Sequence, residues 1–338
     1  MALQRREFLS LMGTGALSTV ALAACGQLGK NTAKVKGPTI GMLQMVDAPP
    51  PNAVRQGFEA ALAKAGYSAG KSINFIQKDA AGELPNTTLV MKQFVSDQVD
   101  MVFAIGTPPL QAAMKTVPET TSVVFAYCSN PWGAGAGTPP GGVGQHKPNV
   151  IGTIGTNPMG KELDLARRIN PKLKTVGVIF NPGEPNSEYE AQVLRDEAKA
   201  RGITVVEQAV ANSGEVLQAA QVLSGKGIEA FVKIGDYATI QGFGSIAKVG
   251  LEKKIPVYSV DADDIKLPGC LATIGWAYYD DGYAAGELAV RVLKGESPKT
   301  MAFEPLTKTE MGVNLATAKA IGVTVPDAVT KEAKTVVR

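Results

Sequence analysis

VDMVFAIGTPPLQAA, residues 99–113, contains a strand-like apolar run that is followed at once by a turn and the start of a helix. Gly106 suits the turn, Thr107 is a good N-cap, and Pro108 suits the first helical position. The same succession recurs along most of the chain. The strand-like runs are residues 38–45, 72–77, 101–105, 122–127, 175–181, 204–209, 230–234 and 256–260. Strands that alternate with helices are typical of parallel sheets built from βαβ units, so the sequence predicts an α/β fold.

This pattern is interrupted between Tyr127 and Thr153. The stretch NPWGAGAGTPPGGVGQHKPNVIGT, residues 130–153, is rich in glycine and proline, and a fresh set of strands and helices begins after it. The chain has 338 residues, which is more than a single domain of the commonest size. We therefore predict two α/β lobes, with the passage between them in this stretch.

The segment RREFLSLMGTGALSTVALAACG, residues 5–26, indicates export. Arg5 and Arg6 begin a match to the twin-arginine signal, whose substrates cross the membrane in a folded state. The apolar run of residues 8–24 spans only about 17 positions and contains several Ser and Thr residues, so it is short for a stable membrane span. A targeting segment therefore fits better than a transmembrane helix.

Leu22 to Cys25 are similar to a bacterial lipobox, in which the cysteine receives diacylglycerol before cleavage. The sequence thus predicts a signal peptide over residues 1–24, a lipidated Cys25 and a flexible tether over residues 25–37. The protein would be exported and lipid-anchored to the cell membrane, facing the periplasm or the cell exterior. The alternative is an ordinary N-terminal helix with a chance cysteine.

The composition argues against several other classes of protein. The net charge of +3 is mild and no arginine cluster is interleaved with aromatic residues, so we predict no binding to nucleic acid. His146 is the only histidine, which leaves almost no material for a Ser-His-Asp triad or a histidine metal site. GYSAGKS, residues 66–72, has one residue too few between its glycines for a phosphate-binding loop. We predict no enzyme activity, no cofactor and no metal.

Cys128 and Cys270 are the remaining cysteines, and each lies in or near a strand-like run. They could pair in an oxidising compartment, but a large core does not need a disulfide. We predict two separate, half-buried thiols.

Candidate ligand-binding residues follow the strands, because ligands bind beyond the carboxyl ends of the strands in open parallel sheets. Thr107 and Ser187 lie at predicted helix starts, whose free N–H groups suit a carboxylate. Ser187 and Glu190 also have the spacing of a capping box. Asp236 and Asp261 follow two strands and could hold a cationic amine. The alternative for these side chains is that they only cap the helices that follow.

Aromatic residues make up 6% of the chain, so clusters among them are informative. Trp276, Tyr278 and Tyr279 lie just before a predicted helix, and Trp132 lies in the Gly/Pro-rich stretch. Both tryptophans therefore fall where the chain is expected to pass between the lobes. An aromatic ring there can stack on a planar ligand or pack the junction, and both possibilities stay open.

Several segments in chain order carry a family resemblance that spans essentially the whole chain after the signal. They are GMLQ, VRQGFEAALAKAGY, VDMVFAIGTPPLQAA, VVFAYCSNPWGAG, NVIGT, KTVGVIFNPGEPNSEYE, EAFVKIGDYAT, KIPVYSVDADD, YYDDGYAAGELAVRVLKGESP and MGVNLATAKAIGVTVP. Together they are similar to the ABC-transporter substrate-binding proteins of the tryptophan/tyrosine-type (TrpX-like) family. The most specific parts are NPGEPNS, residues 181–187, and VNLATAKAIGV, residues 313–323.

The resemblance implies a type I periplasmic-binding-protein fold with two Rossmann-like lobes. It places three crossovers near residues 149–153, 272–277 and 308–312. One lobe would contain residues 38–150 plus 275–307, and the other residues 151–274 plus 308–338. The resemblance also implies a receptor that closes its cleft around a small-molecule ligand and delivers it to an ABC permease in the membrane.

Three short runs differ from the residues that are usual in this family. Ser129-Asn130-Pro131 stands where many members have Thr-Asp-Pro, and Asp236-Tyr237-Ala238 stands where they often have Asp-Asn-Thr. Trp276-Ala277-Tyr278-Tyr279 replaces the usual Phe-Asp-Tyr-Tyr. An acid is lost and aromatic rings are added in the expected cleft. An aromatic amino acid is thus one candidate ligand, and another planar or amide-bearing small molecule is the other.

The sequence therefore predicts a lipid-anchored solute receptor of an ABC importer that works by cleft closure and not by chemistry. The candidate ligand-binding residues are Gln44, Thr107, Ser129, Asn130, Trp132, Ser187, Asp236, Tyr237, Asp261, Trp276 and Tyr278. Gln44 and Asn130 would contact polar edges of the ligand, and Trp276 or Trp132 its flat face. The alternatives are an exported α/β enzyme and a ligand-sensing domain for a membrane kinase.

Overall fold

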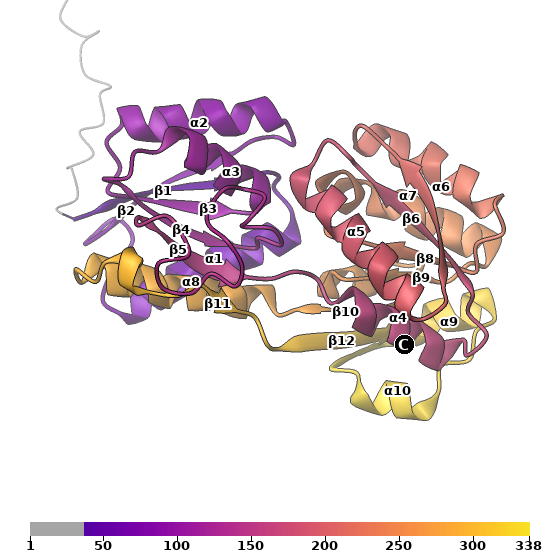
Figure 1. Ribbon diagram of the computed structural model, residues 1–338. Coiled ribbons are helices and arrows are strands. Elements are labelled where there is room, and N and C mark those ends of the chain that lie inside the picture. The colour runs from indigo at the N-terminus through magenta and orange to yellow at the C-terminus, as the bar shows by residue number, and fades with distance from the viewer. Residues whose placement is uncertain (1–36) are drawn as a thin grey trace, which may run out of the picture. The chain divides into compact units, whose positions relative to one another are not determined.

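The computed structural model describes residues 37–338, which fall within one compact unit of the chain. The expected signal peptide, Cys25 and nearly all of the expected tether lie outside the described residues. Among residues 37–338, no helix has the length and apolar character needed to cross a membrane. This part of the chain forms two α/β lobes, each organised around one sheet (Figure 1).

Lobe 1 is built on a six-stranded sheet with the order β11-β5-β4-β3-β1-β2, whose paired strands are parallel. The strands are β1 (Thr39–Gln44), β2 (Asn74–Asp79), β3 (Met101–Ile105), β4 (Ser122–Ala126), β5 (Val150–Ile154) and β11 (Glu304–Pro305). One face is covered by α2 (Leu84–Ser96) and α3 (Thr107–Thr116), and the other by α1 (Pro49–Lys64) and α8 (Tyr278–Leu293) (Figure 1). Strands buried on both faces become continuous apolar runs, which is the pattern that the sequence shows.

Lobe 2 is built on a seven-stranded sheet with the order β13-β12-β10-β9-β8-β6-β7, in which β10 and β12 pair antiparallel. The strands are β6 (Thr175–Phe180), β7 (Thr204–Ala209), β8 (Ala230–Lys233), β9 (Val257–Ser259), β10 (Cys270–Trp276), β12 (Thr309–Asn314) and β13 (Thr335–Val337). The helices are α4 (Met159–Ile169), α5 (Pro185–Ala200), α6 (Val216–Ser224), α7 (Tyr237–Lys253), α9 (Leu315–Ile321) and α10 (Asp327–Glu332). Short 3-10 turns of this lobe are η1 (Ser213–Glu215) and η2 (Ala262–Lys266), whereas η3 (Pro298–Thr300) lies between α8 and β11 of lobe 1.

The chain passes between the two sheets three times. It leaves β5 for α4 through residues 155–158, leaves β10 for α8 at Ala277, and leaves β11 for β12 through residues 306–308. The first passage comes later than expected. We expected lobe 1 to end at residue 150, but residues 150–154 form β5, which pairs with β4 in the sheet of lobe 1. The predicted α/β fold with two lobes and three crossovers is confirmed.

Each lobe has its own apolar core. In lobe 1, Phe58 of α1 stacks on Phe103 of β3 with ring centroids 3.8 Å apart. In lobe 2, neighbouring residues of β8 enter clusters on opposite faces of the sheet, Val232 with α4 and α5 and Phe231 with α6 and α7. The eight strand-like runs of the sequence coincide with β1 to β4 and β6 to β9, with small differences at their ends. The strands β5 and β10 to β13 are not among these eight runs.

Candidate functional site

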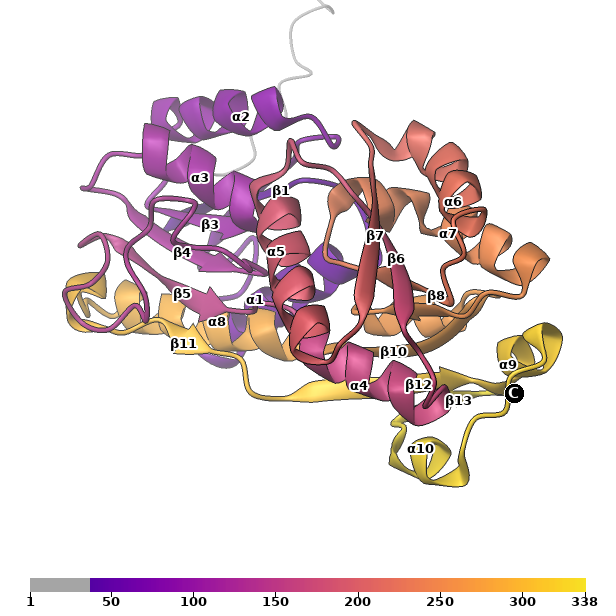
Figure 2. The same ribbon diagram turned by 45° about the vertical axis from the view of Figure 1, so that its right-hand side comes forward.

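A small enclosed cavity of about 20 Å³ lies between the lobes. Its lining residues are Thr107, Tyr127, Ser129, Gly155, Asn157, Asn186, Glu190, Gly235, Tyr237, Trp276, Tyr278 and Asp281. Several of them follow strands, and two lie on α5, which is next to lobe 1 in both views (Figures 1 and 2). A volume of this size holds about one water molecule, so the lobes are closed upon each other in this arrangement.

Lobe 2 places three hydrogen-bond acceptors at this cavity: Asn157, Asn186 and Glu190. The Glu190 carboxylate accepts from Asn157 Nδ2 at 2.9 and 3.1 Å and from the backbone N–H of Gly235 at 2.6 Å. Asn186 Nδ2 donates to the carbonyl oxygen of Gly235 at 2.8 Å. Because each amide NH₂ group faces an acceptor, the orientation of each amide is fixed. The two Oδ1 atoms are buried and find no hydrogen-bond partner among residues 37–338.

The pKa of Glu190 is raised by burial and lowered by hydrogen bonds, so a charged ligand can change the ionisation of this side chain. Burial raises the pKa of Glu190 to about 7. Hydrogen bonds from Asn157, from the Gly235 N–H and from the Ser129 hydroxyl act in the opposite direction, because they favour the ionised form. Ser129 belongs to lobe 1, so it favours the ionised form of Glu190 from across the boundary between the lobes. A cation placed beside Glu190 would lower this pKa and complete the ionisation.

Aromatic side chains form the opposite wall of the cavity. The Tyr127 ring meets the Tyr278 ring edge-on at 5.0 Å and the Tyr237 ring at 6.4 Å. The Tyr278 hydroxyl donates to Asp261 at 2.6 Å, and the indole N–H of Trp276 donates to the carbonyl oxygen of Thr156 at 3.1 Å. These rings combine a flat apolar surface with hydroxyl groups at the edge.

Tyr127 is held in an uncommon backbone conformation by Asp281. Its φ of 55° lies in the left-handed region, which few tyrosines adopt. The Tyr127 backbone N–H donates to the Asp281 carboxylate at 2.9 Å, and the Thr153 hydroxyl donates to the same group. Burial raises the pKa of Asp281 to about 6. Asp281, near the start of α8, thus holds the backbone that presents the Tyr127 ring to the cavity.

The helix starts differ from the predicted caps. The N-cap of α3 is Gly106, and Thr107 is the first helical residue, with its hydroxyl 3.4 Å from the Cys128 sulfur. Helix α5 begins at Pro185, so Ser187 lies inside its first turn and donates to Asp236 instead of capping. The predicted capping box of Ser187 and Glu190 is wrong, because both side chains bind other partners across lobe 2. Thr107 still lines the cavity, whereas Ser187 does not.

The two aspartates that were expected to hold a ligand amine are already engaged and do not line the cavity. Asp236 caps α7 through the Thr239 N–H at 2.8 Å, and it accepts from the Asn181 N–H at 2.6 Å. Asp261 accepts from the buried ammonium of Lys233 and from Tyr278. For Asp236, the structure corresponds to the capping alternative. For Asp261, an internal cation takes the place that was expected for a ligand.

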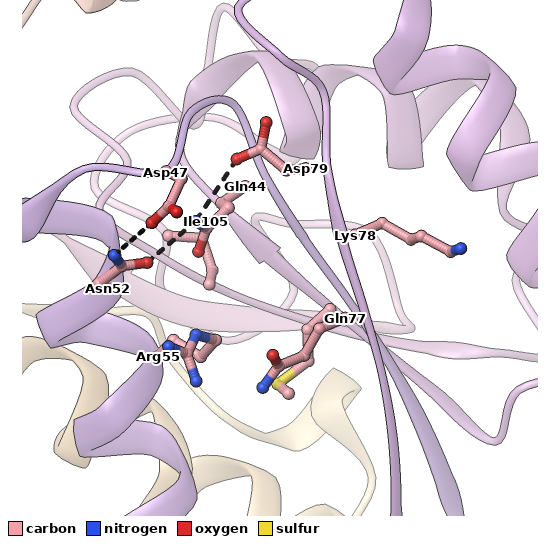
Figure 3. A pocket seen from close by; sticks show the side chains of 9 residues that line it. Gln44, Asp47, Asn52, Arg55, Gln77, Lys78, Asp79 and Ile105 are labelled. Carbon is pink, nitrogen blue, oxygen red and sulfur yellow. Dashed lines mark hydrogen bonds between the residues drawn. The ribbon is translucent and has the colours of Figure 1, made fainter. Parts of the chain in front are cut away.

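Three more of the candidate residues lie away from the interlobe cavity. Gln44 lines a separate pocket of about 250 Å³ in lobe 1, where its Nε2 donates to Asn52 Oδ1 at 3.0 Å beside Arg55 (Figure 3). Trp132 stacks on Phe303 at 5.7 Å. Asn130 Oδ1 accepts from a backbone N–H within its own turn. None of the three lines the cavity: Gln44 ends β1 at the separate pocket, and the Gly/Pro-rich stretch that carries the other two folds onto lobe 1.

The structure thus brings together part of the predicted set and adds residues that were missed. Candidates that line the cavity are Thr107, Ser129, Tyr237, Trp276 and Tyr278. Side chains that were missed are Tyr127, Asn157, Asn186, Glu190 and Asp281. A usable signal existed for Glu190, because a glutamate on the buried face of an amphipathic helix needs an internal partner.

The prediction for the two cysteines is confirmed in its main point, because Cys128 and Cys270 are free and buried. They are more deeply buried than expected, and burial raises the pKa of Cys128 to about 12. Within residues 37–338, no group of three or more His, Cys, Asp or Glu side chains is placed to hold a metal ion.

Comparison with known proteins agrees with this arrangement. Residues 39–337 match the family described as ABC transporter substrate binding protein. The chain is 33% identical to the tyrosine-binding protein of Clostridioides difficile over 330 residues, which cover 94% of this chain and 93% of that protein.

Two solved structures show the same fold in different states. An ABC domain in complex with L-Trp from Streptococcus pneumonia is 26% identical and has a TM-score of 0.80, over 88% of this chain and 100% of that one. A ligand-free, open substrate-binding protein from Clostridium difficile is 32% identical but has a TM-score of 0.67, over 89% of this chain and 99% of that one. The likeness is greater to the ligand-bound structure although its sequence is more distant, which agrees with the closed cavity.

Proposed function

The chain belongs to the family of ABC transporter substrate-binding proteins, and from this premise we propose that it captures a free amino acid between its lobes and delivers it to a membrane permease. Proteins of this family bind small molecules outside the cytoplasm and are not enzymes. The prediction of a binding protein without enzyme activity therefore holds.

The observation that supports an amino acid most directly is the convergence of Glu190, Asn157 and Asn186. An α-ammonium group has three N–H donors and one positive charge. Glu190 supplies a carboxylate, and the two amides supply acceptor oxygens that are buried without a partner in the described residues. An ammonium group would satisfy these acceptors and ionise Glu190, which converts a costly empty site into charge-assisted hydrogen bonds.

The rest of the amino acid has complementary surroundings in lobe 1. Thr107 begins α3, and its backbone N–H and the positive dipole end of the helix favour a carboxylate, although the two prolines that follow it carry no N–H. Tyr127 and Tyr278 of lobe 1 offer flat surfaces to a ring, as does Trp276 at the end of β10. The two relatives, one named tyrosine-binding and one in complex with L-Trp, handle aromatic amino acids. We therefore propose an aromatic amino acid as the ligand.

Cleft closure is the proposed working step. In the closed form, the Tyr278 hydroxyl of lobe 1 donates to Asp261 of lobe 2, and Ser129 of lobe 1 favours the ionised form of Glu190 of lobe 2. A ligand that contacts both lobes stabilises this closed form over the open one, and the three connections between the sheets act as the hinge. The division into lobes at these connections is part of the proposal.

Membrane attachment is proposed from the sequence, because Cys25 and the paired arginines lie outside the described residues. Incorporation of labelled fatty acid into the wild type, and its loss in Cys25→Ser, would support lipid anchoring. Failure of the wild type to incorporate label would overturn it. Replacement of Arg5 and Arg6 by lysine should block export, because lysine does not reproduce the guanidinium pair. Unchanged export would contradict the twin-arginine route.

The experiment for the ligand site is calorimetric titration of wild type and Glu190→Gln with an amino-acid panel. Loss of the charge-assisted bond should weaken binding by about 1.5 to 3 kcal/mol, which is roughly ten- to a hundredfold. The matched control is Glu188→Gln on the same helix, whose side chain is 51% exposed and pairs with Arg195. The control should bind as the wild type does. Equal affinity of Glu190→Gln and wild type would remove Glu190 from the site.

A further inference from the structure

Tyr237 belongs to lobe 2 by sequence but is buried in lobe 1. It is the first residue of α7, and the residues that follow it, such as Ala238 and Phe243, pack in the lobe 2 core. The Tyr237 side chain is 3% exposed and packs with the apolar core of lobe 1 instead. The ring therefore crosses the boundary between the lobes and moves with lobe 2 whenever they separate.

The base of Tyr237 is fixed by hydrogen bonds within lobe 2. Its backbone N–H donates to Glu184 Oε2 at 3.0 Å. The preceding residue, Asp236, caps α7 and is held by Asn181 and Ser187. The backbone that presents the ring is thus rigid, and the ring reaches across the cleft as a fixed projection.

Lobe 1 has a place that receives the Tyr237 ring. A Cβ atom at Gly106 would overlap the Tyr237 hydroxyl oxygen, so a glycine at the start of α3 is required for this close approach. Gly106 also has a φ of 108°, which other residues rarely adopt. Tyr127 packs against the edge of the Tyr237 ring from the neighbouring strand end. The receiving pocket therefore has the shape of an aromatic side chain.

From this geometry we propose that Tyr237 is a specificity-determining residue. Its ring competes with the ligand's side chain for the receiving pocket beside Gly106 and Tyr127. The proposal rests on the proposed function, since it concerns how an amino acid fits the same site. With Tyr237 inserted, the closed cavity holds about 20 Å³, which cannot contain an aromatic side chain. A ligand ring must therefore displace the Tyr237 ring, whereas a small side chain need not.

The expected change in ligand affinity follows from the apolar surface that is buried in the receiving pocket, either by the Tyr237 ring or by the ring of the ligand. Full burial of a large apolar side chain changes an equilibrium constant by about one to two orders of magnitude. The apparent affinity for a ligand is also reduced by the fraction of protein whose site is already filled. Tyr237 should therefore weaken binding of aromatic amino acids about tenfold or more and leave small amino acids nearly unaffected.

The test compares Tyr237→Ala with two controls, Tyr237→Phe, which keeps the ring, and Tyr279→Ala, which removes a tyrosine that is 46% exposed. Titration with L-tryptophan, L-tyrosine and L-alanine should show at least about tenfold tighter binding of the aromatic ligands by Tyr237→Ala, and less than about twofold change for alanine. Both controls should keep the wild-type ranking. Unchanged aromatic binding by Tyr237→Ala would show that the ring does not compete with the ligand. Weaker binding would show that Tyr237 is a partner of the ligand. Either result would overturn the proposal.

A second measurement needs no ligand. Small-angle X-ray scattering of the unliganded proteins should give a larger radius of gyration for Tyr237→Ala than for the wild type and Tyr237→Phe, because an interlobe contact is lost. An unchanged radius would overturn the role of the ring in closure. If the radius of gyration increases but no variant binds any amino acid, the proposed ligand class fails. The insertion of the Tyr237 ring into the receiving pocket is still supported in that case.

Discussion

The two lobes share one layered architecture but bury different chemistry. Among the described residues of lobe 1, the only buried acid is Asp281 on α8. Lobe 2 buries a set of charged side chains, namely Glu162, Glu184, Glu190, Lys233, Asp236 and Asp261. In contrast, lobe 1 contributes Tyr127 and Tyr278 to the aromatic wall. The comparison indicates that lobe 2 fixes the charged end of a ligand and that lobe 1 supplies the surface that closes over it.

Most of the buried charges in lobe 2 bind one another or the backbone rather than a ligand. Lys233 is 1% exposed, and its ammonium binds Asp261 and, at 2.7 Å, Asp264. Glu184 accepts the backbone N–H of Tyr237. Because charge is costly to bury alone, such networks hold together only as complete sets. Their role is to position α5, which carries Asn186 and Glu190, and the start of α7, which carries Tyr237.

The largest expected effect comes from breaking this network. Lys233→Met keeps the approximate length of the side chain, but it removes the ammonium group that lies over the Phe243 ring and leaves Asp261 and Asp264 without their cation. Removing one partner of a buried pair costs about 3–5 kcal/mol of the free energy of unfolding. Urea unfolding measures this loss.

The control for this prediction is Arg168→Met at the exposed pair of Arg168 and Glu332, whose side chains are 40% and 58% exposed. The control should lose at most about 1 kcal/mol, because exposed pairs contribute little. If Lys233→Met is as stable as the control, the buried ion pairs of lobe 2 do not stabilise that lobe, and the proposed contrast between the lobes fails.

A second prediction concerns the pH dependence of stability without ligand. Burial raises the pKa of Glu190 from 4.5 to about 7, so the folded protein binds more protons than the unfolded chain between these values. The free energy of unfolding should therefore fall as pH rises from about 4.5 to 7, by roughly 3 kcal/mol from Glu190. The raised pKa of Asp281 acts in the same direction at lower pH.

The contribution of Glu190 is isolated by subtracting the profile of the wild type from that of Glu190→Gln. The difference in the free energy of unfolding should grow in favour of the variant as pH rises through this window. A difference that does not change with pH would show that Glu190 titrates normally and that its burial imposes no cost.

Ligand affinity should have the opposite pH dependence. An ammonium ligand binds the ionised form of Glu190, so the affinity should rise about tenfold between pH 6 and pH 8 in the wild type. Glu190→Gln should bind weakly with little change over this range. Titration calorimetry at several pH values measures both. A wild-type affinity that is constant from pH 6 to 8 would contradict the role of Glu190 as the partner of a cation.

The smallest expected effect concerns the contact that links the two halves of the site. Ser129→Ala removes a hydroxyl that acts on Glu190 from across the cleft as a hydrogen-bond donor and favours its ionised form. Loss of one such hydrogen bond should weaken ligand binding by about 1 kcal/mol, or roughly fivefold. The pKa of Glu190 should also rise further, because Ser129 favours its ionised form. An affinity equal to that of the wild type would mean that closure does not depend on this contact.

The fold was largely predictable because burial on both faces turns parallel strands into apolar runs. Runs such as Met101–Ile105 coincide with a strand of the structure. The C-terminal strands were not predictable in this way. Glu304–Pro305 is two residues long, and Thr309–Asn314 is polar along its first half and pairs antiparallel with β10. Short strands at an edge depend on their neighbours and leave a weak local pattern.

The site was predictable where a residue type is informative by itself or where a polar or aromatic residue follows a strand. Trp276 and Tyr278 were found because aromatic residues are scarce, and Tyr237 was found because it follows a strand. Asn157 and Glu190 were missed because their role depends on a hydrogen bond between segments that are 33 positions apart. Asp261 was misassigned for the same reason, since its partner Lys233 lies 28 positions away. A pattern in the chain indicates what a strand end can offer, but not which internal group already uses it.

The most direct test of the account compares two ligands on the unmodified protein: L-tryptophan and indole-3-propionate, which lacks only the α-ammonium group. If Glu190, Asn157 and Asn186 hold that group, titration calorimetry should show tryptophan binding at least about a hundredfold more tightly, because the analogue leaves the three acceptors without a donor. Equal affinity for the two ligands would contradict the central claim that lobe 2 recognises the ammonium group of an amino acid.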